Sequence, residues 1–66
     1  MTITVNGSRR SVPDGISVSE LVVHLGIAEG PVAVEINGAV VPRAQHAHRR
    51  VVEGDVVEVV HFVGGG

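Results

Sequence analysis

The group with the clearest chemical potential is the carboxylate that follows three glycines, Gly64, Gly65 and Gly66. A turn after a strand needs only one or two glycines, and glycine lacks a Cβ, so such a segment can thread a narrow channel. Three residues extend about 10 Å. Chain ends are also commonly loose, so the alternative is a tail without a role.

Four histidines raise the question of a metal site. His46 and His48 are two positions apart, but the chain has no cysteine, and no third ligand stands at the spacing of a structural zinc site. We therefore predict no metal site. His46 and His48 are expected in a solvent-exposed loop, His24 on a helix surface, and His61 half-buried at the rim of the core.

The charged residues carry no catalytic or nucleic-acid signature. The net charge is −2, and Arg43, Arg49 and Arg50 have no interleaved aromatic residues for base stacking. We expect a solvated face there, with partner docking as the second interpretation. Three carboxylates are also expected to face solvent: Glu53, Asp55 and Glu58. Because no nucleophile–base pair, carboxylate pair or phosphate-binding loop is recognisable, we predict no catalytic residue and no enzyme activity.

The size and composition indicate one small domain. The 66 residues allow a single core, and we assign residues 1–63 to the domain and residues 64–66 to a flexible tail. The N-terminus lacks the features of a secretory signal, and no apolar run approaches the length of about 18 residues that spans a bilayer. We expect a cytoplasmic protein with neither a membrane nor a nucleic acid as partner.

The hydrophobic pattern predicts strands around one helix. The predicted strands are residues 2–5, 8–12, 32–36, 39–41 and 56–63, and the predicted helix is residues 18–25. Asn6-Gly7 and Asn37-Gly38 favour tight hairpin turns, which need positive φ at both central positions. Ser17 and Glu20 have the spacing of a helix capping box, and Gly26 suits the position that ends the helix.

The connection before the last strand is less regular. Residues 43–48 predict an irregular segment or a single helical turn, residues 49–52 a short extended piece, and residues 53–55 a turn. The last strand is apolar on both faces, which favours a central position in the sheet. Val57 and Val59 are expected to face the core. The opposite face is expected to carry Val56, Glu58, Val60 and Phe62.

These elements resemble a known family. The order of hairpin, helix and strands, the stretch VEINGAVVPR at residues 34–43, the EGD turn at residues 53–55 and the terminal glycines cover nearly the whole chain. Together they resemble the ThiS/MoaD-like group of ubiquitin-like proteins, and within it the ThiS family of sulfur carrier proteins in thiamine (thiazole) biosynthesis. The resemblance implies an α+β fold of the β-grasp type, with a mixed sheet of four to five strands and one helix packed across one face.

The resemblance also implies a chemical role for the tail. Gly66 would be adenylated by a ubiquitin-activating-like enzyme that uses ATP and would then become a thiocarboxylate, with Gly65 and Gly64 as a flexible neck. The implied partners are this adenylating enzyme, a thiazole synthase and a sulfur donor such as a cysteine desulfurase, and the chain itself would bind no cofactor stably. The residues predicted to dock a partner are Phe62, Val60, Glu58 and Arg43.

Other interpretations stay open on the sequence. The small subunit of molybdopterin synthase uses the same terminal chemistry but tends to be longer. A carrier could also serve another sulfur metabolite, and a conjugated protein modifier is a further alternative. A β-grasp module that binds partners without any covalent step would carry the same fold with an idle tail.

Overall fold

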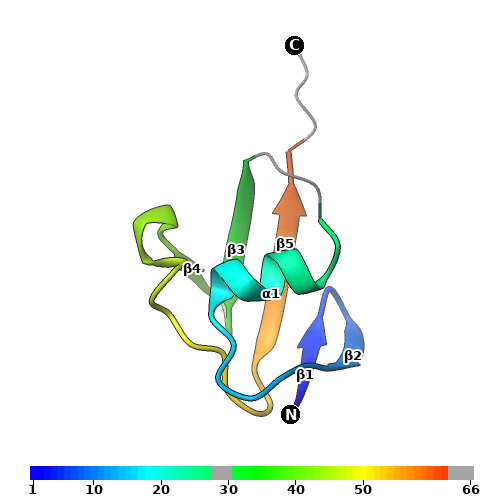
Figure 1. Ribbon diagram of the computed structural model, residues 1–66. Coiled ribbons are helices and arrows are strands. Elements are labelled where there is room, and N and C mark those ends of the chain that lie inside the picture. The colour runs from blue at the N-terminus through cyan, green and yellow to red at the C-terminus, as the bar shows by residue number, and fades with distance from the viewer. Residues whose placement is uncertain (28–30, 63–66) are drawn as a thin grey trace.

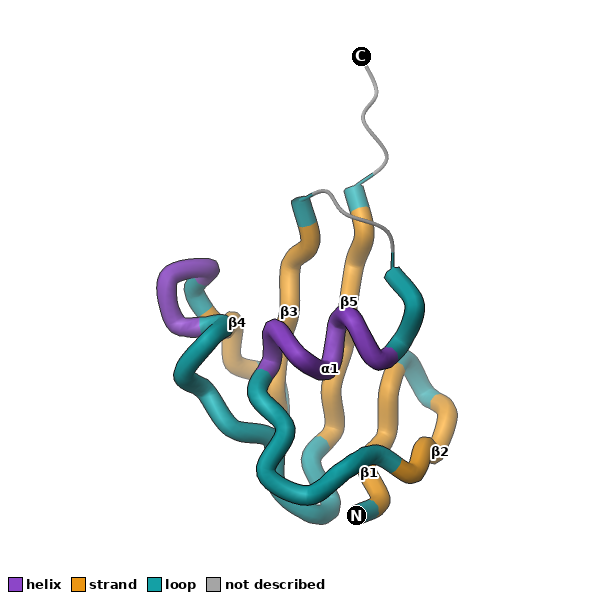
Figure 2. Tube along the Cα trace, viewed as in Figure 1, coloured by secondary structure: helices purple, strands orange, loops and turns teal. Residues whose placement is uncertain are grey.

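The computed structural model describes residues 1–27 and 31–62, which form one mixed β-sheet with a helix across one face (Figures 1 and 2). In chain order the elements are β1 (Thr2–Val5), β2 (Ser8–Ser11), α1 (Val18–His24), β3 (Val32–Ile36), β4 (Ala39–Val41), the 3-10 helix η1 (Arg43–Gln45) and β5 (Val56–His61). The predicted order of strands and helix is confirmed. The helix and β2 each end one residue earlier than predicted. β5 ends at His61, before Phe62, so the last strand is shorter than predicted, and Val63 lies outside the described residues.

The sheet has the strand order β2-β1-β5-β3-β4, so the last strand of the chain is its central strand, as predicted. β5 pairs in parallel with β1 and antiparallel with β3, and the two hairpins β1–β2 and β3–β4 form the two sides of the sheet. The N-terminal hairpin and the C-terminal strand are thereby joined although they lie at opposite ends of the sequence (Figure 1).

Both Asn-Gly pairs form the turns that their sequence predicts. Asn6 and Gly7 have φ values of 49° and 83°, and Asn37 and Gly38 have values of 52° and 85°. Asparagine and glycine tolerate this left-handed region better than other residues do. These two turns fix the registers of the hairpins, and with them the face that each strand side chain occupies.

The helix begins with the predicted capping box. Glu20 N donates to Ser17 Oγ at 3.1 Å, and Ser17 N donates to Glu20 Oε1 at 2.9 Å. Two backbone donors that would otherwise lack partners at the helix start are satisfied in this way. The helix then ends before Gly26, which adopts a φ of 74°.

The core lies between α1 and the sheet. It consists of twelve buried aliphatic residues: Ile3, Val5, Val12, Ile16, Val18, Leu21, Val34, Ile36, Val41, Val51, Val57 and Val59. Burial of one such side chain contributes about 1.5–3 kcal/mol, so aliphatic packing carries the fold. The predicted core orientation of Val57 and Val59 is confirmed. Among the described residues, no helix has the length and hydropathy needed to cross a bilayer.

The segment after β4 corrects one prediction. His46 is 8% exposed rather than solvated, because η1 turns the chain back toward the helix start. His46 Nε2 lies 3.0 Å from the carbonyl oxygen of Val41, and its own carbonyl oxygen accepts a hydrogen bond from Ser19 N at 2.9 Å. The histidine therefore ties this segment to β4 and to α1.

Candidate functional site

One face of the sheet is covered by α1, and the other face is open (Figure 1). We call this second surface the open sheet face; its exposed aliphatic and aromatic residues are Val40, Val56, Val60 and Phe62, and its carboxylates are Glu35 and Glu58. Alternate residues of a strand share a face, so β5 brings Glu58 and Val60 together, and Phe62, the residue after its end, continues the same alternation. Val60 is 51% exposed and Phe62 is 53% exposed. Large apolar side chains exposed side by side are typical of a docking surface.

Arg43, the fourth predicted docking residue, lies elsewhere. It is exposed at the start of η1, directly after the edge strand β4, and β3 separates β4 from β5 (Figure 2). The structure therefore gathers Glu58 and Val60 on β5 and Phe62 directly after it, and places Arg43 in η1, after the edge strand β4.

Asn6 holds β5 from one side. Asn6 Oδ1 accepts a hydrogen bond from Val59 N at 2.8 Å, and Asn6 Nδ2 donates to the carbonyl oxygen of Val59 at 3.1 Å. The two residues are 53 positions apart in the sequence. The side chain of Asn6 thus continues the hydrogen bonding between β1 and β5 beyond the end of β1.

Asn37 holds β5 from the other side, together with Asp55. Asn37 Oδ1 accepts from Val56 N at 2.9 Å, and Asn37 Nδ2 donates to Asp55 Oδ1 at 3.0 Å. Asp55 Oδ2 also accepts from Val52 N at 2.9 Å.

Asp55 is only 5% exposed, so the prediction that it faces solvent is wrong, because both of its oxygens are used to anchor the start of β5. Glu53 and Glu58 are exposed, as predicted.

The far end of β5 leads toward the glycine tail. His61 pairs with Val32, and Phe62 N donates to the carbonyl oxygen of Pro31 at 3.0 Å. His61 is exposed rather than half-buried, because it lies beyond the part of β5 that the core residues cover. The predicted tail residues, Gly64, Gly65 and Gly66, lie outside the described residues.

The described histidines and carboxylates form no metal site. Within residues 1–27 and 31–62, no group of three or more histidine, aspartate or glutamate side chains is close enough to hold a metal ion. His46 uses one ring nitrogen for a backbone contact, and His24, His48 and His61 are exposed.

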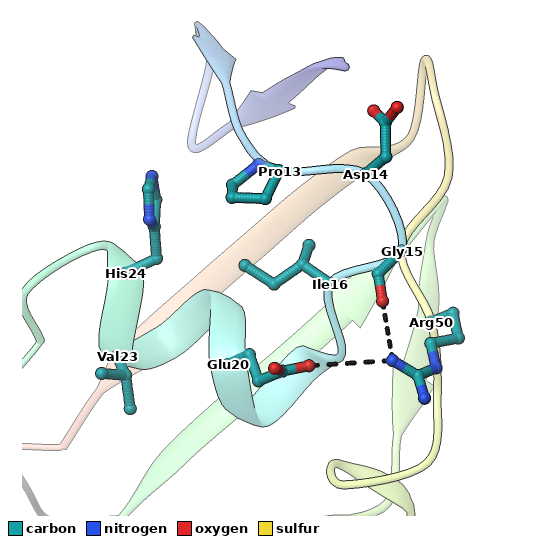
Figure 3. Close-up of a pocket in the computed structure, with 8 residues that line it drawn as sticks. All are labelled: Pro13, Asp14, Gly15, Ile16, Glu20, Val23, His24 and Arg50. Atoms are coloured by element: carbon teal, nitrogen blue, oxygen red, sulfur yellow. Dashed lines mark hydrogen bonds and ion pairs between the residues drawn. The ribbon is translucent and has the colours of Figure 1, made fainter.

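A hollow of about 430 Å³ lies beside the helix, away from the open sheet face (Figure 3). Arg50 Nη1 donates to the carbonyl oxygen of Gly15 at 2.7 Å and lies 3.8 Å from Glu20 Oε1. The hydrogen bonds from Ser17 and the charge of Arg50 lower the pKa of Glu20. These contacts fasten the segment before α1 to the segment before β5, which is a structural role, and none of the predicted docking residues lines the hollow.

The sequence did not reveal what the two turn asparagines or Glu35 do. The Asn-Gly pairs predicted turns, but the side-chain contacts with β5 depend on which strand becomes the neighbour in the sheet. The position of Glu35 beside Glu58 likewise depends on β3 becoming the neighbour of β5 in the sheet. Only the alternation within VAVEI hinted at the outward position of Glu35.

The comparison with known families gives one match over almost the whole chain. A sequence model of the ThiS family matches residues 3–66. Two proteins named thiazole synthase, from Paramagnetospirillum magneticum and Magnetococcus marinus, are 38% and 42% identical to the chain over 66 residues. The match covers all of this chain but 20% of each relative, so the chain spans about a fifth of their length.

Solved structures agree with this match and with the predicted β-grasp fold. The crystal structure of a thiamine biosynthesis protein (ThiS) from Geobacter metallireducens has a TM-score of 0.84 and 39% sequence identity, and the match covers 100% of both chains. The solution structure of a thiamine biosynthesis protein from the same organism has a TM-score of 0.82 at 39% identity, and covers 100% of this chain and 88% of the other.

Proposed function

Because the chain belongs to the ThiS family, we propose that it is a sulfur carrier of thiamine biosynthesis whose sulfur is used for thiazole formation. The observation that carries this proposal is the match in fold and sequence to a thiamine biosynthesis protein over the full length of both chains. The thiazole synthase relatives, which contain a region similar to this chain, support a thiazole synthase as one partner.

Gly66 would carry the sulfur. Its carboxylate is a poor acyl donor, because the leaving group would be oxide. Attack of this carboxylate on the α-phosphorus of ATP releases pyrophosphate and gives an acyl adenylate, from which AMP is a good leaving group. A sulfur nucleophile then attacks the acyl carbon and displaces AMP. If the donor is the persulfide of a cysteine desulfurase, the product is an acyl disulfide, and a thiol reductant cleaves its S–S bond, which leaves the thiocarboxylate on Gly66 and takes up the donor sulfur as a disulfide. We assign ATP binding, adenylation and sulfur transfer to the partner enzymes. We expect these enzymes and the carrier in the cytoplasm, where ATP is available.

The fold suits a carrier that must present one chain end to several active sites. β5 is the central strand, hydrogen-bonded on both sides and anchored by Asn6 and Asn37. Phe62, the last described residue, lies on the open sheet face next to the tail. We therefore propose that the open sheet face docks the adenylating enzyme and the thiazole synthase, while Gly64, Gly65 and Gly66 enter their active sites.

Mass spectrometry tests the chemistry. A protein that ends at Gly66 is incubated with the adenylating enzyme, ATP, the sulfur donor and a thiol reductant, and its intact mass is measured. We expect an increase by the mass difference between sulfur and oxygen, located on the C-terminal peptide. Persistent absence of this species would refute the carrier proposal.

A variant with one serine added after Gly66 is the matched control. It lacks a free carboxylate on Gly66, so we expect no thiocarboxylate, while its melting temperature stays that of the unextended protein. A module that acts only by non-covalent binding would keep its function in this variant.

Deletion of the gene should cause a requirement for thiamine or its thiazole precursor, whereas loss of molybdenum-enzyme activity would indicate the molybdopterin synthase alternative.

A further inference from the structure

Two carboxylates face each other across the centre of the open sheet face. Glu35 on β3 and Glu58 on β5 are direct partners in the antiparallel register. Directly opposite residues have Cβ atoms about 4.5–5.5 Å apart. Glu58 is exposed and Glu35 is half-buried. The two side chains therefore project from adjacent positions on the open sheet face.

This arrangement opposes folding. Like charges directly across a sheet destabilise it, and no ion pair of the described residues compensates for them: the described pairs join the N-terminal amine to Asp14 and Arg50 to Glu20. A local feature that lowers the stability of the folded protein, with no compensating contact inside the protein, is characteristic of a functional site. The carboxylate pair therefore needs an explanation outside the fold itself.

The surroundings of the pair are apolar. Val40 on β4 is the direct partner of Glu35 and is 70% exposed, and Val56 and Val60 flank Glu58 along β5 with exposures of 49% and 51%. A protein surface that covers these valines would exclude water from the carboxylates and would strengthen their attraction for a cation. Two carboxylates alone do not supply the six or more oxygen ligands that a calcium ion takes, which favours a side chain as the cation.

We propose that the open sheet face docks a protein partner that inserts one arginine or lysine between Glu35 and Glu58 and packs apolar side chains on Val40, Val56 and Val60. An arginine fits best, because its planar group presents several donors to two acceptors at once. This inference rests on the proposed function only for the identity of the partners, the adenylating enzyme and the thiazole synthase.

Binding measurements with Glu35→Gln and Glu58→Gln test the inference. Calorimetric titrations with each of the two enzymes should show about tenfold weaker binding to at least one of them for either variant, with a reduced dependence on salt. The same substitutions should raise the melting temperature by about 1–5 °C, because the repulsion is removed. A side chain that only keeps the surface soluble would give the stabilisation without the loss of binding.

Glu58→Lys and Glu53→Gln complete the design. Glu58→Lys places opposite charges across the strands, so we expect the highest melting temperature together with the weakest binding. Glu53 is an exposed carboxylate whose Oε2 accepts a hydrogen bond from Thr2 N at 3.0 Å; glutamine keeps that acceptor, so Glu53→Gln should bind like the wild type.

The outcomes separate the two proposals. Equal binding by the wild type, Glu35→Gln and Glu58→Gln would overturn this inference alone. If the wild type binds neither enzyme, the proposed function fails and this inference fails with it. Restoration of tight binding to Glu58→Lys by a single arginine-to-glutamate change in the enzyme would confirm the predicted contact.

Discussion

Ser17 and Glu20 show how two side chains begin the only described α-helix. Each satisfies a backbone donor of the other, and Ser17 is buried while Glu20 stays exposed. The hydrogen bonds from the backbone and side chain of Ser17, with a smaller contribution from Arg50, lower the pKa of Glu20. The valine-rich helix has little intrinsic stability, so its start depends on these contacts and on packing against the sheet.

Glu20→Gln should change the response of stability to acid. The folded state lowers the pKa of Glu20, so the unfolded state binds more protons as the pH falls, and the contribution of Glu20 to stability is lost. The wild type should be the more stable protein at neutral pH, and the difference from Glu20→Gln should shrink as the pH falls through the pKa of Glu20 in the folded state. Urea unfolding between about pH 6 and about pH 3 measures this. Parallel stability curves for the two proteins would contradict it.

At the scale of elements, β5 organises the molecule. It is the last strand in sequence and the central strand in space, and side chains from the two hairpin turns extend its hydrogen bonding on both sides. A central strand held in this way gives the residues next to the tail a fixed position. The backbone hydrogen bonding of the described chain therefore extends at least to the bond between Phe62 N and the carbonyl oxygen of Pro31.

Substitutions at Asn6 should separate its two roles. Asn6→Gly keeps the positive φ but removes both side-chain hydrogen bonds to Val59, and we expect a loss of about 1–3 kcal/mol in unfolding free energy. Asn6→Ala also forces alanine into the left-handed region, which costs about 1–2 kcal/mol more. Urea unfolding gives the free energies, and hydrogen exchange of the Val59 amide should accelerate in Asn6→Gly. An unchanged exchange rate would show that the amide does not depend on Asn6.

At the scale of the whole molecule, the two faces of the sheet differ in exposure. One face buries the core under α1 (Figure 1). The other exposes Val40, Val56, Val60 and Phe62 beside Glu35 and Glu58. Because the core lies on the first face, truncation of an apolar side chain on the open sheet face leaves no cavity in the core. Such a substitution can therefore weaken docking without a loss of stability.

Phe62→Ala tests the docking role of the open sheet face. The side chain is half-exposed, so we expect little change in melting temperature but at least about tenfold weaker binding to the adenylating enzyme or the thiazole synthase, as is usual for a central aromatic contact. Val23→Ala is the control, because Val23 is 77% exposed on the helix side and its loss should leave binding unchanged. Comparable losses for both variants would show that docking is not confined to the open sheet face.

The local pattern was sufficient for most of the fold. The two Asn-Gly turns, the capping box of Ser17 and Glu20, and the alternation in β5 are properties of neighbouring residues, and the structure confirms them. The glycine tail and the VEINGAVVPR stretch also predicted the ThiS family correctly. The roles of Gly64, Gly65 and Gly66 stay predictions.

The contacts between distant residues were decided only by the tertiary structure. His46 and Asp55 appeared solvent-exposed because their partners, the carbonyl oxygen of Val41 and the amide of Asn37, reach them only after the chain has turned back on itself. The pairing of Glu35 with Glu58 likewise follows from the register between β3 and β5. A periodic sequence specifies which side of a strand a residue occupies, but the neighbour across the sheet is chosen by the packing of the whole chain.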